Sequence, residues 1–118
     1  MTNLPVQITL TAEAEGDLQS IYNWRLKQRG ADGPDGADAL LDTVYEAMEG
    51  LAEFPFRGPV PPELEQLGMV EWRQISIWPF RIIYTVEADV VTISVVADSR
   101  RDFSAILERR LLQRPPRG

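Results

Sequence analysis

The 118-residue sequence contains no cysteine and no histidine. Without cysteine there are no disulfide bonds and no thiolate metal sites, and without histidine there are no imidazole ligands and no usual general base near neutral pH. Nucleophilic catalysis by a cysteine or by a Ser-His pair is excluded for the same reason. Any chemistry must therefore use arginine, carboxylate, tyrosine, serine or lysine side chains. We expect neither a metal ion nor a cofactor.

Long apolar runs are also missing. No run of about 18 apolar residues, the length that crosses a membrane as a helix, occurs anywhere in the chain. Residues 1–10 lack the basic start and the continuous apolar stretch of a signal peptide. We therefore expect a cytoplasmic protein without a membrane partner.

Lysine is almost absent, since Lys27 is the single lysine among 12 basic residues. The net charge of −6 argues against direct binding of nucleic acid. The charge is uneven: residues 1–66 carry twelve acidic and four basic residues, whereas residues 67–118 carry six acidic and eight basic ones, all arginine. Arginine suits planar, bidentate recognition of carboxylate or phosphate, although a high genomic G+C content would produce the same bias.

The first half predicts a short strand followed by two amphipathic helices. Apolar and polar residues alternate over residues 6–10, which is typical of a half-buried strand. Thr11 is the expected N-cap of a helix whose apolar stripe runs to Arg25 or Leu26 and which ends at Gly30. A second apolar stripe at helical spacing covers residues 37–51. The short connection between the two predicts an antiparallel helical hairpin.

The second half predicts a loop and three strands. Four prolines and two glycines between residues 55 and 68 predict a loop without regular structure. Strand-like runs follow at residues 70–77, 80–87 and 90–97, the last two joined by a tight hairpin at 88–89. The middle run is apolar on both faces, so we expect a central strand. A change of phase between Trp72 and Ile75 predicts a bulge in the first run.

A short C-terminal helix is expected to begin near Asp102 or Ser104 and to reach Leu111, before a frayed tail at residues 114–118. Length and ordinary globular composition, with 44% hydrophobic and 25% charged residues, predict a single domain over residues 1–118. The predicted fold class is α+β, with the element order β-α-α-β-β-β-α. In this fold an N-terminal helical hairpin packs on a mainly antiparallel four-stranded sheet, and the short helix follows.

Five segments, taken in order, resemble landmarks of the ParE/RelE toxin superfamily, the toxins of bacterial type II toxin-antitoxin modules, also called plasmid stabilisation proteins. They are residues 11–22 (TAEAEGDLQSIY), 51–58 (LAEFPFRG), 72–73 (WR), 80–84 (FRIIY) and 99–102 (SRRD). The resemblance covers about residues 6–112. Members commonly carry a histidine shortly before the last motif, where this sequence has Asp98.

The superfamily divides by target. RelE-like members cut ribosome-bound mRNA with Lys, Arg and Tyr side chains, and the resemblance places Arg73, Arg81 and Arg101 where such bases fall. The lysines are missing, and Leu107 stands at the tyrosine position. Because arginine remains charged, it is a poor proton donor or acceptor, so the acid-base half of RNA cleavage is not provided.

The resemblance is therefore closer to ParE-like members, which bind and block DNA gyrase without catalysis. It implies a toxin neutralised by a cognate antitoxin, whose DNA-binding N-terminal part precedes a segment that folds over the helical hairpin and the sheet. A RelE-like ribosome-dependent mRNA endonuclease, or a non-toxic relative that only binds an antitoxin, remains the alternative.

Candidate partner-binding residues lie mainly in the basic half: Arg73, Trp78, Arg81, Arg100, Arg101, Arg109 and Arg110. Trp78 is expected in an exposed strand turn, where an aromatic side chain can anchor a partner or cap the core. Arg81 lies within a strand, so either a structural ion pair with a helix acid or a phosphate- or partner-binding role is expected. The tyrosines, Tyr22, Tyr45 and Tyr84, are expected in the core or at its edge.

An acidic stripe follows one face of the second helix, at Asp38, Asp42, Glu46 and Glu49, and continues to Glu53. Such a stripe is typical of a solvated helix face, and it also suits a basic segment of an antitoxin. Helical carboxylates without a converging loop hold Mg²⁺ weakly, so no metal site is expected there.

Overall fold

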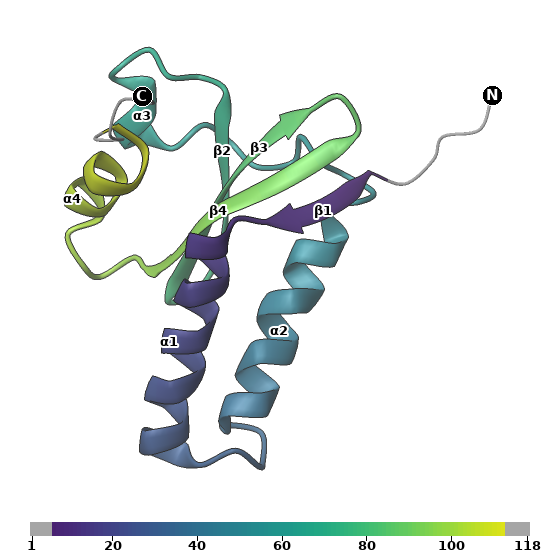
Figure 1. The fold of residues 1–118 in the computed structure, drawn as a ribbon, viewed down its shortest axis with the longest axis vertical. Coiled ribbons are helices and arrows are strands. Elements are labelled where there is room, and N and C mark those ends of the chain that lie inside the picture. Colours follow the sequence, from purple (N-terminus) through teal and green to yellow (C-terminus); the bar gives the residue numbers. More distant parts are fainter. Residues whose placement is uncertain (1–5, 113–118) are drawn as a thin grey trace.

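The computed structural model describes residues 6–112. Its elements are β1 (Gln7–Leu10), α1 (Ala12–Arg29), α2 (Ala37–Gly50), α3 (Pro62–Glu65), β2 (Trp72–Ile77), β3 (Phe80–Glu87), β4 (Val90–Asp98), α4 (Phe103–Leu107) and a π-helical turn, η1 (Glu108–Leu112). This order confirms the predicted α+β succession, with α3 added. In Figure 1, α1 and α2 run side by side as a hairpin below the sheet. The predicted tail, residues 114–118, lies outside the described residues.

The four strands form one mixed sheet in the order β1-β4-β3-β2. β1 lies parallel to β4, whereas β2 and β4 both run antiparallel to β3. The expectations of a mainly antiparallel sheet and of a central strand over residues 80–87, which is β3, are confirmed.

The predicted bulge between Trp72 and Ile75 is wrong, because β2 pairs with β3 in unbroken register. The two side chains are out of phase because they pack on opposite faces of the sheet. Ile75 packs on the face that carries the helical hairpin, and Trp72 packs on the other face. The irregularity lies instead between β3 and β4, where the register shifts at Ile83 and Tyr84. Ser94 is the extra residue of that bulge.

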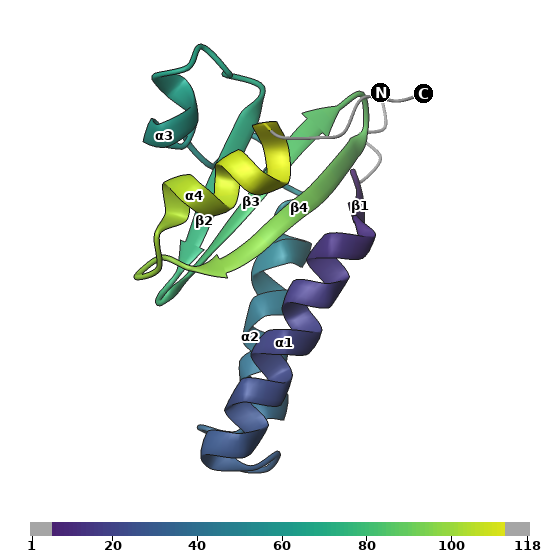
Figure 2. The same cartoon turned by 60° about the vertical axis from the view of Figure 1, so that its left-hand side comes forward.

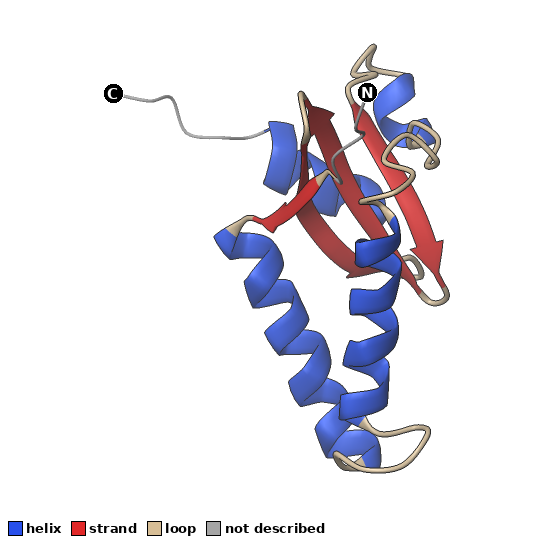
Figure 3. Ribbon diagram, turned by 90° about the vertical axis from the view of Figure 1, so that its right-hand side faces the viewer, coloured by secondary structure: helices blue, strands red, loops and turns tan. Residues whose placement is uncertain are grey.

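Helices lie on both faces of the sheet, as Figures 2 and 3 show, and each face has its own apolar core. The hairpin-side core contains Ala14, Leu18, Val44, Met48, Leu51, Ile75, Ile82, Tyr84, Val91, Ile93 and Val96. The opposite core, beneath α4 and α3, contains Leu64, Ile83, Val95, Ala97, Phe103, Ile106, Leu107 and Leu111. Neighbouring residues of β3 thus enter different cores, as the pleat of a strand requires.

The helices begin and end where the sequence predicts. The Thr11 hydroxyl accepts a hydrogen bond from the Ala14 N–H at 3.1 Å, which caps α1. Gly30 follows the last turn with φ of 75°, a conformation that favours glycine. Asp102 caps α4 in the same way as Thr11 caps α1, by accepting from the Ala105 N–H.

The hairpin extends beyond the end of the sheet (Figure 3). The first half of α1 buries Ala14 and Leu18, but Trp24 and Leu26 are 47% and 40% exposed. The predicted stripe to Leu26 is therefore wrong at its far end, because no strand lies beneath that part of the helix. Tyr45, which was expected in the core or at its edge, is not in the core: it is 41% exposed and lines a shallow groove between α1 and α2 together with Leu18 and Tyr22.

The predicted loop at residues 55–68 contains the short helix α3, so the expectation of no regular structure is wrong. Pro62 occupies the first turn, where a missing N–H costs no hydrogen bond. Leu64 is buried against the α4-side core.

Arg81 of β3 holds this helix on the sheet. Its Nη1 and Nη2 each donate to one carboxylate oxygen of Glu63 at 2.9 Å, and its Nε donates to Gln74 Oε1 at 2.7 Å. The guanidinium also lies 3.8 Å from the centre of the Phe103 ring. The arginine in a strand thus has the structural ion pair with a helix acid that the sequence allowed.

Gly58 lies where the segment before α3 crosses the edge strand β2. Its N–H donates to the Tyr84 hydroxyl at 3.1 Å. A Cβ atom at this position would lie 2.2 Å from the Gln74 carbonyl oxygen and 2.7 Å from the Tyr84 hydroxyl. The crossing therefore requires glycine.

We expect Gly58→Ala to lower the free energy of unfolding by about 1–3 kcal/mol, because the added methyl group meets backbone that must shift. Gly16→Ala is the matched control: no atom outside the helix's own backbone lies within 4 Å of a Cβ there, and alanine should stabilise α1 by roughly 0.5–1 kcal/mol. Urea denaturation measures both. Equal effects at the two positions would contradict the tight crossing.

The Arg81 guanidinium holds the pKa of Glu63 below its usual value of 4.5, mainly through their hydrogen bonds. A carboxyl group with a lowered pKa in the folded state stabilises the protein above its unfolded pKa, and this stability is lost as the pH falls through the folded pKa. We expect Glu63→Gln to cost about 1–2 kcal/mol at pH 7. The difference from the native chain should shrink below about pH 4. Denaturation curves at pH 7 and pH 3 test this, and a difference that does not change with pH would refute it.

Candidate functional site

A groove of about 340 Å³ lies where α1, the second half of β4 and the α4–η1 segment meet. Its charged lining residues are Asp17, Asp98, Arg101, Arg109 and Arg110. Its apolar lining includes Ile21 and Trp24 of α1, Phe80 of β3, Val96 of β4 and Ile106 of α4. We call it the arginine groove, because it brings together three of the arginines predicted to bind a partner.

The floor of the arginine groove is a strand edge without a neighbour. β1 pairs with β4 only as far as Ile93, whose carbonyl accepts the Thr11 N–H at 3.0 Å. The chain then turns into α1. From Ser94 to Asp98, β4 therefore has β3 on one side and, within residues 6–112, no strand on the other.

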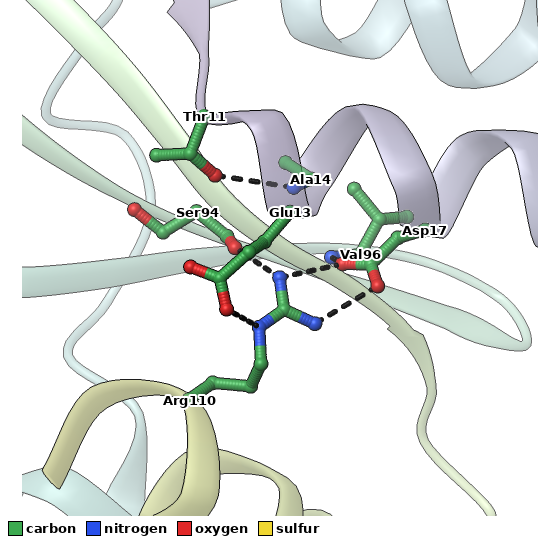
Figure 4. Close-up of polar contacts among 7 residues, drawn as sticks. All are labelled: Thr11, Glu13, Ala14, Asp17, Ser94, Val96 and Arg110. Carbon is green, nitrogen blue, oxygen red and sulfur yellow. Dashed lines mark hydrogen bonds and ion pairs between the residues drawn. The ribbon is translucent and has the colours of Figure 1, made fainter. Parts of the chain in front are cut away.

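Asp17 of α1 takes the place of the missing strand (Figure 4). Its Oδ2 accepts the Val96 N–H at 2.9 Å, and its two oxygens accept from Arg110 Nη1 and Nη2 at 2.9 and 3.0 Å. Arg110 Nη2 also donates to the Ser94 carbonyl at 2.7 Å, and its Nε lies 3.3 Å from a Glu13 oxygen. The carbonyl of the bulge residue Ser94 and the N–H of Val96 on the strand edge thus both have hydrogen-bond partners.

The neighbouring arginines differ sharply in their surroundings. The Arg110 side chain is only 15% exposed and is bound to Asp17 within the chain, and its role in binding a partner stays a prediction. Asp17 and the Ser94 carbonyl already occupy its donors. Arg101 and Arg109 lie exposed on the rim of the arginine groove.

Arg73 is also engaged within the chain. Its Nη1 donates to the carbonyls of Phe56 and Gly58 at 3.1 and 2.7 Å, and its guanidinium lies 5.0 Å from the centre of the Phe56 ring. Arg73 therefore holds the segment around Gly58 against β2 by hydrogen bonds, as Arg81 holds α3 against the sheet through Glu63.

The three arginines that the resemblance placed at a catalytic centre are not brought together. Arg73 pairs with Tyr84, whose side chain enters the hairpin-side core. Arg81 projects from the same face of β3 as Ile83, which enters the opposite core. Arg73 and Arg81 thus leave the sheet from opposite faces, and Arg101 lies at the arginine groove.

A second exposed surface, which we call the Trp78–Arg100 tip, lies at the β2–β3 turn. Trp78 is 77% exposed, as its position in a turn predicted, and the Arg100 guanidinium lies 5.9 Å from the centre of its ring. Asp98 holds Arg100 by accepting from its backbone N–H and its Nε, each at 2.9 Å, and from Nη2. These hydrogen bonds lower the pKa of the Asp98 carboxyl and raise that of Arg100.

The acidic stripe on α2 is solvated, with Asp38, Asp42, Glu46 and Glu49 all exposed. Asp38 accepts a hydrogen bond from the Tyr22 hydroxyl at 2.7 Å, and this bond raises the pKa of Tyr22. The stripe therefore faces solvent beside the joint of the two helices. Whether it binds a partner stays a prediction.

Among residues 6–112 no group of three or more carboxylates could hold a metal ion. No helix in this part of the chain is both long enough and apolar enough to cross a membrane.

The site residues predicted from the sequence include neither Asp17 nor Trp24, although both line the groove. One signal was present for Asp17. It shares the face of α1 that carries Ala14, Leu18 and Ile21, and a carboxylate on an apolar helix face needs a buried partner. That the partner is Arg110, 93 residues away, is not visible in the sequence.

Comparison with known proteins points to one family. The family model described as the ParE toxin of the type II toxin-antitoxin system parDE matches residues 8–103. Among curated protein sequences, none matches this chain.

Two solved structures share the fold. One belongs to the chromosomal ParDE toxin-antitoxin system of P. aeruginosa, with a TM-score of 0.63, 20% identity and coverage of 79% of this chain and 95% of that one. The other comes from the toxin-antitoxin complex RelBE2 of Mycobacterium tuberculosis, with a TM-score of 0.55, 20% identity and coverage of 82% of this chain and 94% of that one.

The family model spans most of the chain, including β1, the helical hairpin and the three-stranded meander that forms the floor of the arginine groove. The chain therefore belongs to the family of ParE toxins of type II toxin-antitoxin systems.

Proposed function

We propose that this chain is a cytoplasmic toxin that blocks DNA gyrase by binding it, and that a cognate antitoxin neutralises it. Membership of the ParE family supports the toxin role. The observation that carries the non-catalytic mode is the internal engagement of the arginines: Arg73 and Arg81 leave the sheet on opposite faces, and each is bound within the chain.

RNA cleavage also needs a general acid and a general base, and the side chains available here are poor ones. The Tyr84 hydroxyl lies in the core, accepts the Gly58 N–H, and has a pKa raised by burial. Leu107, at the position where the superfamily's nucleases carry tyrosine, is buried in the α4-side core. A leucine has no proton to transfer, and a buried tyrosine whose pKa is raised further above neutral is a poor acid-base catalyst near pH 7. This favours inhibition by binding.

An antitoxin partner is supported by the two structural neighbours, both of which come from toxin-antitoxin systems. The chain offers two surfaces of opposite charge for it. The acidic stripe on α2, at Asp38, Asp42, Glu46 and Glu49, suits a basic segment, while the exposed arginines on the groove rim suit an acidic one.

The Trp78–Arg100 tip is the surface we assign to gyrase. Tryptophan and arginine are enriched among the residues that carry the binding energy of protein interfaces. Here the Arg100 guanidinium lies 5.9 Å from the centre of the Trp78 ring, and Asp98 holds Arg100 in that position. A side chain that is held in place before binding loses little entropy when a partner arrives.

The decisive experiment is a DNA gyrase supercoiling and cleavage assay with the purified chain, with and without its antitoxin. We expect supercoiling to be inhibited with cleaved DNA trapped on gyrase, and the antitoxin to relieve both effects. If soluble, folded protein has no effect on supercoiling or cleavage, gyrase is not the target. Cleavage of ribosome-bound mRNA by the same preparation would then identify a ribonuclease.

Trp78→Ala should weaken gyrase inhibition about tenfold or more, because it removes the exposed aromatic anchor. The free energy of unfolding should change by less than about 0.5 kcal/mol, since the side chain makes little contact with the core. Phe54→Ala is the matched control, because it removes another exposed aromatic side chain, 64% exposed, outside the tip. Equal inhibition by both variants would exclude the tip as the gyrase surface.

A further inference from the structure

One line of side chains runs along α1 on the side away from the sheet. Its members are spaced four, three, four and three residues apart: Glu15, Gln19, Tyr22, Leu26 and Arg29. Four of them are exposed and the central one is partly buried. Asp17, which binds β4, lies two residues from both Glu15 and Gln19 and therefore on the opposite side of the helix. We call this line the outer stripe. Its spacing is that of the seam along which two helices pack in a coiled coil.

The middle of the outer stripe borders an apolar groove. This groove, of about 390 Å³, lies between α1 and α2, and Leu18, Tyr22, Leu41 and Tyr45 are among its lining residues. Tyr45 is 41% exposed, and Leu26, one turn further along the stripe, is 40% exposed. Burial of exposed apolar side chains against a second apolar surface is favourable, so this part of the hairpin favours a partner.

The two ends of the outer stripe carry opposite charges. Glu15 lies in the first turn of α1 and Arg29 in the last turn, about 21 Å apart at the rise of an α-helix. Tyr22 lies midway, seven residues from each. Among residues 6–112, neither Glu15 nor Arg29 forms an ion pair. A segment of one charge sign would attract one end of the stripe and repel the other.

A second copy of α1, turned end for end, matches both ends. Each Glu15 then lies beside the partner's Arg29, so the same ion pair forms twice about a two-fold axis. At the axis the two Tyr22 side chains meet. The Tyr22 hydroxyl donates to Asp38 within its own chain at 2.7 Å, so its burial leaves no polar group without a partner.

We propose that the outer stripe of α1 binds the outer stripe of a second copy of this chain, as an antiparallel pair of helices related by a two-fold axis at Tyr22. This homodimer does not depend on the proposed target or on the antitoxin. The outer stripe shares no residue with the arginine groove or with the Trp78–Arg100 tip.

Sedimentation equilibrium of the purified chain tests the dimer. The native chain should reach twice the mass of one chain as its concentration rises. Glu15→Arg and Arg29→Glu should each weaken the dimer about tenfold or more, because each places a like-charge pair at the interface twice. Lys27→Glu is the matched control: it makes the same charge change in the same last turn, but two residues from Arg29 and so on another side of α1. We expect it to dimerise as the native chain does.

A charge swap distinguishes this pairing from any other. In an equal mixture of Glu15→Arg and Arg29→Glu chains, each altered end meets an opposite charge, so a heterodimer should form although each variant alone is monomeric. The double variant should regain the native dimer for the same reason. Urea denaturation of each variant shows whether it is folded, and exposed positions such as these should tolerate the changes.

Three results would overturn the proposal. The first is a native chain that stays monomeric up to millimolar concentration. The second is a dimer that the charge reversals leave unchanged or that the swap does not restore, because another surface then joins the two copies. The third is a monomeric chain in which the NMR signals of Tyr22 and Leu26 shift only when the antitoxin is added, because the antitoxin then occupies this face. Each of these leaves the gyrase assay to decide the proposed function separately.

Discussion

The ion pair between Asp17 and Arg110 is the interaction on which the arrangement of this fold depends. β4 is longer than β1, so its second half lacks a neighbour just where the chain turns into α1. Asp17 and Arg110 satisfy the Val96 N–H and the Ser94 carbonyl there, and in doing so they join α1, β4 and η1. Both side chains are largely withdrawn from water, so removal of either partner would leave an uncompensated charge. The same pair lies in the lining of the arginine groove.

Local patterns in the sequence were sufficient for most of the fold. The Thr11 cap, the apolar stripe of α2 and the two apolar faces of β3 each depend on neighbours within a few residues, and each was predicted. The failures concern relations between distant segments. Leu26 belongs to a good amphipathic pattern but extends past the sheet, and the phase change at Trp72 reflects two separate cores instead of a bulge. Neither can be known before the lengths of the helices and of the sheet are compared in space.

The sequence indicated which types of residue form the candidate site, but it did not indicate how their side chains are arranged. Arg109 and Arg110 are adjacent in the sequence and were treated alike, yet one lies on the groove rim and the other is buried beside Asp17. The two arginines differ because their side chains leave the helical turn in different directions, and because Asp17, 93 residues away in the sequence, binds Arg110. Arg81 was the informative exception. A charge within an apolar strand requires a partner, and the structure supplies Glu63.

Asp98 connects the two surfaces to which we assign partners. Its side chain lines the arginine groove and also holds Arg100 against Trp78. The groove and the tip therefore share one residue at the end of β4. Loss of the Asp98 carboxylate would act on both surfaces, because it removes a charge from the groove lining and releases Arg100 from its hydrogen bonds. Loss of Trp78 would change the tip alone, since Trp78 does not line the groove.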